Sequence, residues 1–167
     1  MTRILLLLVL VTSAFCAYAQ EPIRKFGIVL LQPDFVLQKR VPSVDALANY
    51  IRAIEGEIGG SIAQSEMKPI SSGFVVVAVR PGQKSNVWLD FEPKLPAAVS
   101  ESVVAKIRKV QPVTVREGPV VFAIKLGLWG GSEPAKTAPS PSEWQAAAQR
   151  AGRPLETSDL VEKIWRD

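Results

Sequence analysis

The chain has 167 residues, of which 47% are hydrophobic and 22% are charged, and its formal net charge is +4. Histidine is absent and Cys16 is the single cysteine, which excludes Ser-His-Asp and Cys-His catalysis and zinc sites of the usual His/Cys kind. Positive and negative residues are interspersed without a basic block, so nucleic acid is not an expected partner.

Residues 1–20 have the three-part layout of a secretory signal peptide. Arg3 supplies the positive region, residues 4–15 form an apolar run, and Ala17-Tyr18-Ala19 is a small-x-small cleavage signal. The apolar run is shorter than the roughly 20 residues that a membrane-spanning helix needs, although an uncleaved anchor is the alternative. We expect removal of residues 1–19 and a periplasmic or secreted mature chain without a transmembrane span.

Cys16 raises the alternative of a lipoprotein, in which this cysteine is acylated. Phe15 precedes it, where a bacterial lipoprotein signal carries a small residue, so cleavage after Ala19 is favoured. Cleavage there leaves no cysteine, and no disulfide can stabilise the mature chain. Because small secreted domains of eukaryotes rely heavily on disulfides, we favour a bacterial periplasm.

The first clear element is a helix that begins after Ser43. An apolar stripe runs along it at steps of three and four residues. The stripe consists of Val44, Leu47, Ile51, Ile54 and Ile58. Ser43 is suited to cap the start of the helix, and Gly59-Gly60 to end it. The earlier apolar run, residues 26–31, is compatible with a first strand or with coil that faces the core.

Residues 74–80 and 87–91 predict the two strands of a hairpin, separated by Pro81-Gly82 and a polar loop. In the second strand, alternate side chains face opposite sides. Val87, Leu89 and Phe91 lie on one side, and Trp88, Asp90 and Glu92 lie on the other.

A second helix is predicted over residues 96–110, with Pro96 in its first turn and Pro112 beyond its end. Its buried stripe consists of Val99, Val103, Ile107 and Val110. The strongest strand signal follows at residues 120–128. One side of that strand consists of Val120, Phe122, Ile124, Leu126 and Leu128, and the other of Val121, Ala123, Lys125, Gly127 and Trp129.

These elements predict an α+β fold, in which a small antiparallel sheet packs on two helices in the order helix, strand, strand, helix, strand. The sheet has three strands, or four if residues 26–31 join it. We assign this domain to residues 20–131. Residues 132–142 are rich in Pro, Ser and Ala, which is typical of a linker, and residues 143–167 predict a helical C-terminal extension in two pieces.

The order of elements over residues 43–129, with the last strand GPVVFAIKLGLW after a helix that ends KIRKVQP, resembles the C-terminal domain of TonB and TolA proteins. In that family a pair of helices packs on one side of a three-stranded antiparallel sheet. The resemblance implies that a sheet edge can pair with an extended segment of a partner. It rests on element order and apolar pattern, so it implies no site residues. The chain departs from the family in its expected signal cleavage and in the segment after the last strand.

Trp88, Asp90 and Glu92 form the constellation with the clearest chemical interpretation. Asp90 and Glu92 are two residues apart on one side of a strand, with about 6 to 7 Å between their backbones. That spacing overlaps the carboxylate separations of glycosidases, and Trp88 is suited to stack on a sugar. The alternative is that one side of an antiparallel sheet meets water and carries charges for that reason. We favour this alternative and expect no catalytic residue, metal or cofactor.

Trp88 and Trp129 both lie opposite the main apolar rows of their strands. Isolated tryptophans are unusual on a surface. Either the C-terminal helices cover them or they form a binding surface.

Three functions from different classes follow. The first is an exported, non-enzymatic binding module whose partner, an envelope protein or peptide segment, contacts a sheet edge or the surface around Trp88 and Trp129. The second is a carbohydrate-active or glycan-binding protein that uses Trp88, Asp90 and Glu92. The third is an envelope structural protein, held at a membrane surface by basic residues and the terminal helix around Trp165. We favour the first.

Overall fold

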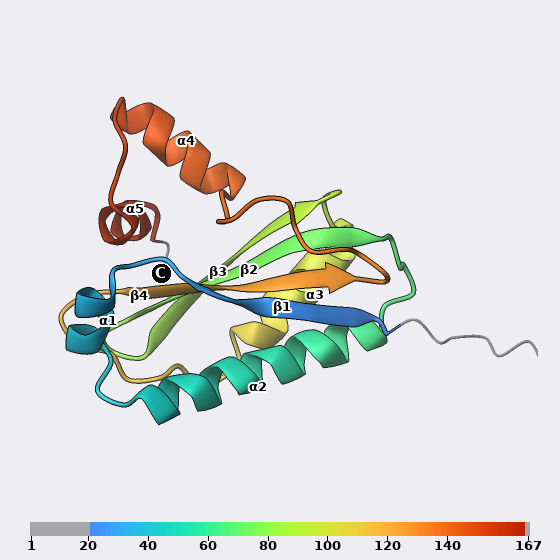
Figure 1. Ribbon diagram of the computed structural model, residues 1–167, viewed down its shortest axis with the longest axis horizontal. Coiled ribbons are helices and arrows are strands. Elements are labelled where there is room, and N and C mark those ends of the chain that lie inside the picture. Colours follow the sequence, from blue (N-terminus) through green and yellow to red (C-terminus); the bar gives the residue numbers. More distant parts are fainter. Residues whose placement is uncertain (1–20, 166–167) are drawn as a thin grey trace, which may run out of the picture.

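The computed structural model describes residues 21–165. In this part of the chain, four strands form one sheet and five helices pack around it (Figure 1). The strands are β1 (Ile23–Leu30), β2 (Ser71–Arg80), β3 (Lys84–Glu92) and β4 (Val120–Leu128). The helices are α1 (Asp34–Arg40), α2 (Val44–Ala63), α3 (Ala97–Ile107), α4 (Ser142–Ala151) and α5 (Thr157–Ile164). All neighbouring strands are antiparallel, in the order β1-β4-β2-β3. The predicted α+β fold is confirmed, with four strands in the sheet.

Strands β2 and β4 lie in the middle of the sheet and are covered on both faces. In β4 the predicted alternation is confirmed, because Phe122 and Ile124 belong to the core on one face and Val121 and Ala123 to the core on the other. A strand that is buried on both faces reads as a near-continuous apolar run. This explains the nearly continuous apolar stretches in both central strands.

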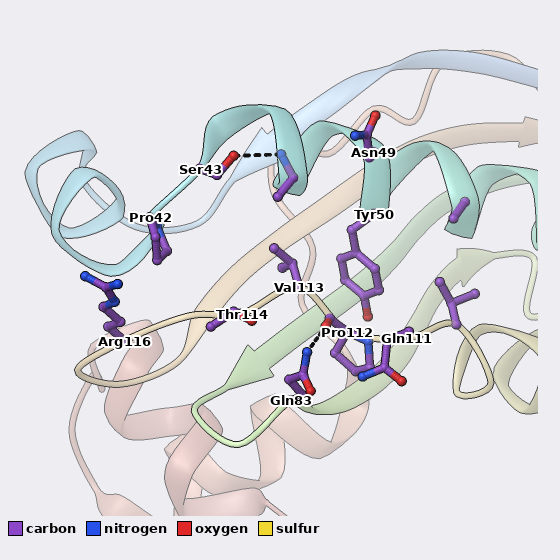
Figure 2. Close-up of a pocket in the computed structure, with 13 residues that line it drawn as sticks. Pro42, Ser43, Asn49, Tyr50, Gln83, Gln111, Pro112, Val113, Thr114 and Arg116 are labelled. Atoms are coloured by element: carbon purple, nitrogen blue, oxygen red, sulfur yellow. Dashed lines mark hydrogen bonds between the residues drawn. The ribbon is translucent and has the colours of Figure 1, made fainter.

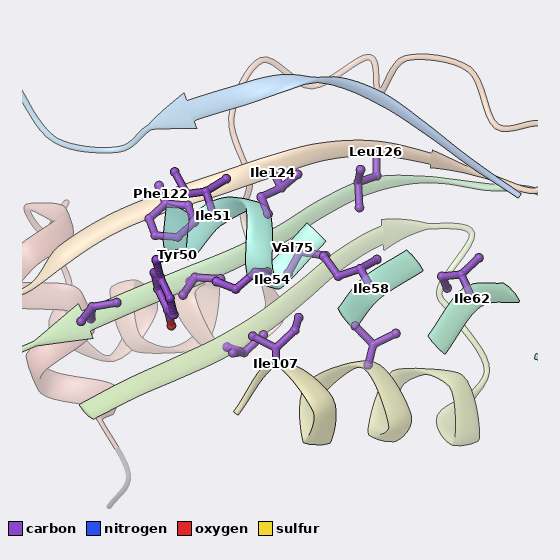
Figure 3. Packing of buried hydrophobic residues seen from close by; sticks show 14 of the residues in the cluster. Tyr50, Ile51, Ile54, Ile58, Ile62, Val75, Ile107, Phe122, Ile124 and Leu126 are labelled. Carbon is purple, nitrogen blue, oxygen red and sulfur yellow. The ribbon is translucent and has the colours of Figure 1, made fainter. Parts of the chain in front are cut away.

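Helices α2 and α3 cover the first face of the sheet (Figure 3). The isoleucines of α2 point toward the sheet, and Ile107 of α3 fills the space beside them (Figure 3). Ser43 caps α2 as predicted, since its side-chain oxygen accepts a hydrogen bond from the backbone N–H of Ala46 at 3.1 Å. The buried hydrophobic residues contributed by the two helices are Tyr50, Ile51, Ile54, Ile58, Ile62, Val99, Val103 and Ile107.

The predicted end of the first long helix at Gly59-Gly60 is wrong, because α2 continues to Ala63. Ile62, in the additional turn, is only 1% exposed. Burial of this side chain offsets the conformational cost of two glycines inside a helix.

Helices α4 and α5 cover the opposite face of the sheet and lie above it in Figure 1. Their buried residues form a second core with the other side chains of β2, β3 and β4. The members from the two helices are Trp144, Ala147, Leu160 and Val161. A polar contact also ties α5 to the rest of the domain, since Ser158 Oγ accepts hydrogen bonds from Gln32 Nε2 (2.8 Å) and Arg40 Nη1 (2.9 Å).

The segment before α2 forms two elements. Strand β1 supplies the fourth strand that the sequence left open, and it pairs with β4 from Ile23 to Leu30. It therefore begins earlier than the apolar run at residues 26–31. Helix α1 was not predicted, and Leu37 is its one buried residue. A helix with a single buried side chain has no apolar stripe from which it can be recognised.

The expected signal peptide, residues 1–19, lies outside the described part of the chain, as do the last two residues. Between residues 21 and 165, no helix combines the length and the apolar character needed to cross a bilayer.

Candidate functional site

The four residues singled out from the sequence lie in two different layers. Trp88, Asp90 and Glu92 occupy alternate positions of β3, and Trp88 belongs to the core beneath α4 and α5. Trp129 belongs instead to the core beneath α2 and α3. It follows the last residue of β4 with a positive φ of 48°, so the alternation of the strand ends before it. The expectation that Trp129 lies opposite the main apolar row is therefore wrong.

Trp88 is covered by α4. Its ring meets the ring of Trp144 edge to face, with centroids 5.7 Å apart and planes at 73°. Only 7% of Trp88 is exposed. Of the two alternatives raised by the sequence, the C-terminal helices cover this tryptophan, and its face is not presented for stacking on a sugar.

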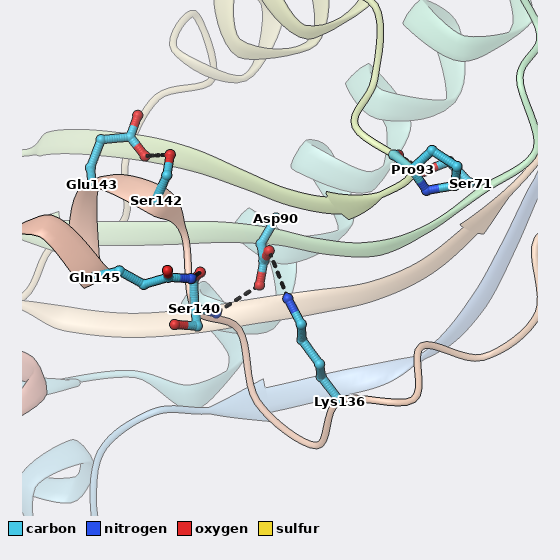
Figure 4. Close-up of polar contacts among 8 residues, drawn as sticks. All are labelled: Ser71, Asp90, Pro93, Lys136, Ser140, Ser142, Glu143 and Gln145. Atoms are coloured by element: carbon cyan, nitrogen blue, oxygen red, sulfur yellow. Dashed lines mark hydrogen bonds and ion pairs between the residues drawn. The ribbon is translucent and has the colours of Figure 1, made fainter.

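Asp90 holds the segment that leads into α4 (Figure 4). Its Oδ2 accepts a hydrogen bond from the backbone N–H of Ser140 at 2.7 Å, and its Oδ1 lies 3.3 Å from Lys136 Nζ. Glu92, two residues further along β3, is exposed. Asp90 and Glu92 both line a cavity of about 400 Å³ beside Lys136. Because both Asp90 oxygens already have partners, this carboxylate serves to fix the 136–140 segment against β3.

A groove follows the outer edge of β3, between α3 on one side and α4 on the other. It consists of two adjoining cavities of about 520 Å³ and about 650 Å³. The first runs along residues 87–92, with Val104 of α3 and Gln145 of α4 at its two sides. The second continues along residues 86–88 and reaches Trp165, after α5. These two cavities together are termed the β3 groove.

The outer edge of β3 presents backbone hydrogen-bonding groups toward this groove. The backbone N–H of Val87 donates to the side-chain Oδ1 of Asn86 at 3.0 Å, which shows that it points away from β2. Along an antiparallel strand, the backbone N–H and C=O groups of successive residues point alternately toward the neighbouring strand and away from it. The N–H and C=O groups of Leu89 and Phe91 therefore also point away from β2. Since β3 is the last strand of the sheet, they face the groove.

Asn86 protects one position of this edge. Its Oδ1 accepts from the N–H of Val87 and also from Arg108 Nη2 at 3.1 Å. A side chain that accepts a hydrogen bond from an edge N–H hinders strand pairing at that position. Charged side chains, prolines and bulges have the same effect on other edge strands. The outward groups of Leu89 and Phe91, further along the strand, lie beyond the position that Asn86 protects.

The opposite edge of the sheet, β1, is less suited to strand pairing. Its register with β4 shifts between Lys25 and Gly27. Arg24 lies over the ring of Phe26, 5.5 Å from the centroid, and Lys25 Nζ forms an ion pair with Glu55 Oε2 of α2 at 2.6 Å. Bulges and charged side chains on an edge strand both hinder pairing with another chain. The edge of β3 is therefore the better candidate for a partner.

A separate cavity of about 590 Å³ lies between the start of α2 and the loop after α3 (Figure 2). Tyr50 points into this region and is 4% exposed. Burial raises the pKa of its hydroxyl, and the neighbouring Ser85 side chain opposes this shift in part. Among the described residues that line the cavity, Tyr50 and Arg116 are the ionisable ones, and none is a carboxylate.

Trp88, Asp90 and Glu92, which were singled out from the sequence, line the first cavity of the β3 groove, whereas the polar residues at its Asn86 end were not singled out. Asn86, Arg108, Arg150 and Lys163 come from four separate segments, and the packing of α3, α4 and α5 brings them to one groove. No local spacing connects them. The sequence showed only that basic residues lie close to the ends of the predicted helices. That position is explained by a favourable interaction with the helix dipole and does not indicate a binding site.

Within residues 21–165, no group of three or more Asp, Glu, Cys or His side chains is placed to hold a metal ion. The chain matches no protein-family model, and neither a curated protein nor a solved structure matches it. The proposed function is therefore derived from the geometry of the β3 groove.

Proposed function

We propose that this protein is an exported, non-enzymatic binding module that takes up an extended polypeptide segment beside β3. The observation that carries the proposal is the open edge of β3 between α3 and α4. A segment in this groove bonds through its backbone to the outward groups of Leu89 and Phe91. In such strand addition, main-chain hydrogen bonds supply affinity, and pockets for alternate side chains supply specificity.

The two walls of the β3 groove differ in character. The wall on the α3 side carries Leu95 and Val104, both partly buried hydrophobic residues. The wall on the α4 side carries Glu143 and Gln145. Alternate side chains of an extended segment point to opposite sides. A partner that alternates apolar and polar residues therefore matches both walls.

The burial of the tryptophans favours the sheet edge over the sheet face as the contact surface. Trp88 and Trp129 are each 7% exposed, so neither indole is presented as an aromatic patch. A sheet edge that pairs with an extended partner is also what the resemblance to TonB and TolA implies. The exported location in the proposal rests on the signal-like residues 1–19.

The test begins with the selection of peptides from a displayed library of random segments of about ten residues, the upper length of a typical strand. The strongest binder is then added to the purified protein, and amide hydrogen exchange is followed by NMR. We expect the amides of Leu89 and Phe91 to become protected, because they gain partners on binding. The amides of Lys25 and Ile28, which point away from β4 on the outer edge of β1, serve as the internal control and keep their exchange rates.

Protection at β1 in place of β3 would reassign the contact to the other edge. Failure of the library to yield any peptide that protects a strand would contradict the proposed function.

A further inference from the structure

The end of the β3 groove nearest to Asn86 is strongly basic. Among residues 21–165, the cationic side chains that line it are Arg108, Arg150 and Lys163, and the acidic one is Glu143. We infer that the segment bound beside β3 is acidic toward its C-terminal end, an inference that rests on the proposed function. Charge complementarity of this kind steers association and selects among partners.

Within residues 21–165, no acidic side chain forms an ion pair with the cations of this end. Arg108 donates to Asn86, whose side chain is uncharged. Among the residues that the structure describes, Arg150 and Lys163 have no ion pair or side-chain hydrogen bond. Hydrogen bonds between such groups and a carboxylate are about twice as strong as those between neutral groups. An acidic residue of the partner therefore gains contacts here that a neutral residue does not.

The direction of the partner follows from the sheet. Every neighbouring pair of strands is antiparallel, and β3 runs from Lys84 to Glu92. A segment that adds to β3 in the same manner runs from Glu92 toward Asn86. Its C-terminal residues therefore lie at the basic end of the groove, and Ile164 and Trp165 provide apolar contact beside them.

The basic end is also connected to the edge itself. Asn86 Oδ1 is shared between the N–H of Val87 and Arg108. A carboxylate that accepts from Arg108 Nη2 competes with Asn86 Oδ1 for one of the two donors that hold the Asn86 side chain in place. Asn86 is then freer to leave the N–H of Val87, and the carbonyl of the partner can take that position. Recognition of the acidic residue thus extends the paired part of the edge.

An acidic glycan or an anionic lipid headgroup has the charge but lacks a peptide backbone. Neither can complete the ladder with Leu89 and Phe91, which is why the structure favours an acidic polypeptide. These two ligand classes become outcomes of the test.

The test compares peptide selections on three forms of the protein. The groove variant carries Arg150→Glu and Lys163→Glu, at two exposed positions of the basic end. The control variant carries Arg52→Glu and Lys68→Glu, which change the net charge equally at exposed positions outside the β3 groove. Circular dichroism and thermal unfolding first establish that all three forms are folded.

We expect the wild type and the control variant to enrich peptides with Asp or Glu in the C-terminal half. The groove variant should lose this preference and bind a wild-type-selected peptide about tenfold more weakly or worse. Enriched peptides without an acidic bias, or with acidic residues in the N-terminal half, would overturn this inference and leave the proposed function standing.

Absence of any enriched peptide would contradict the proposed function itself. Phosphatidylglycerol vesicles and a polyuronate glycan are assayed in parallel on the wild type and the groove variant. Binding of either one that depends on Arg150 and Lys163, with no peptide enriched, would assign the basic end to that ligand and overturn the inference.

Discussion

The indole of Trp88 on β3 and the indole of Trp144 on α4 meet edge to face, with centroids 5.7 Å apart. The contact joins the sheet to a helix that follows the Pro- and Ser-rich residues 132–142. Both rings belong to the second core, and aromatic pairs of this geometry contribute about 1 kcal/mol beyond the burial of their area. The C-terminal helices therefore complete the hydrophobic interior on that face of the sheet.

Replacement of Trp144 by Ala should lower the free energy of unfolding by about 3 kcal/mol, because a large buried ring leaves a cavity. The measurement is urea unfolding followed by circular dichroism. Trp144→Phe is the matched variant. The indole N–H of Trp144 is buried without a hydrogen-bond partner among the described residues, so Phe keeps a ring and loses no polar contact. Equal losses for the two variants would contradict the packing role of the ring.

The hydroxyl of Ser158 accepts hydrogen bonds from Gln32 and Arg40. Gln32 and Arg40 also donate to the Pro119 carbonyl, so each keeps one partner when the hydroxyl is removed. We expect Ser158→Ala to cost about 1 to 2 kcal/mol of unfolding free energy in urea. Ser65→Ala, which removes a local hydrogen bond to the Met67 carbonyl, should stay within about 0.5 kcal/mol of the wild type. A Ser158 variant as stable as the Ser65 variant would show that α5 is held by its apolar contacts.

Asp90 and Glu92 should differ sharply when each is replaced by Ala. Asp90→Ala removes the acceptor of the Ser140 N–H and the partner of Lys136, and should cost about 1 to 2 kcal/mol. Trypsin should then cleave after Lys136 faster, because the segment opens more often. Glu92 is exposed, and its replacement should change neither quantity. If Asp90 served a glycan and not the fold, its replacement would reduce glycan binding and leave the rate of cleavage unchanged.

The predictable part of the fold lies in segments whose pattern is local. Strand β4 alternates two apolar rows, and both rows are buried because helices cover both faces of the sheet. Ser43 caps α2 because a capping side chain needs only the next few backbone N–H groups. Errors arose where a distant contact decides the outcome. Burial of Ile62 carries α2 past Gly59-Gly60.

The candidate site was predictable only in its general location. The alternation of β3 identified which side chains share a side, and the hairpin pattern placed that strand beside β2. That β3 lies at the edge, with α3 and α4 beside it, depends on the order of strands and on helices that come later in the chain. The burial of Trp88 depends on Trp144 in the same way. Neither relationship has a signal in local sequence spacing.

Tyr50 should make the stability of the protein fall at alkaline pH. Burial raises the pKa of its hydroxyl above the ordinary value of 10.0, and Ser85 opposes this only in part. The unfolded chain therefore loses the proton from about pH 10, while the folded chain keeps it. The stabilising contribution is complete below that pH and is lost as the pH rises through the folded-state pKa. We expect Tyr50→Phe to lose less unfolding free energy than the wild type between about pH 9 and about pH 11. Urea unfolding across this range measures the difference, and parallel curves for the two proteins would contradict it.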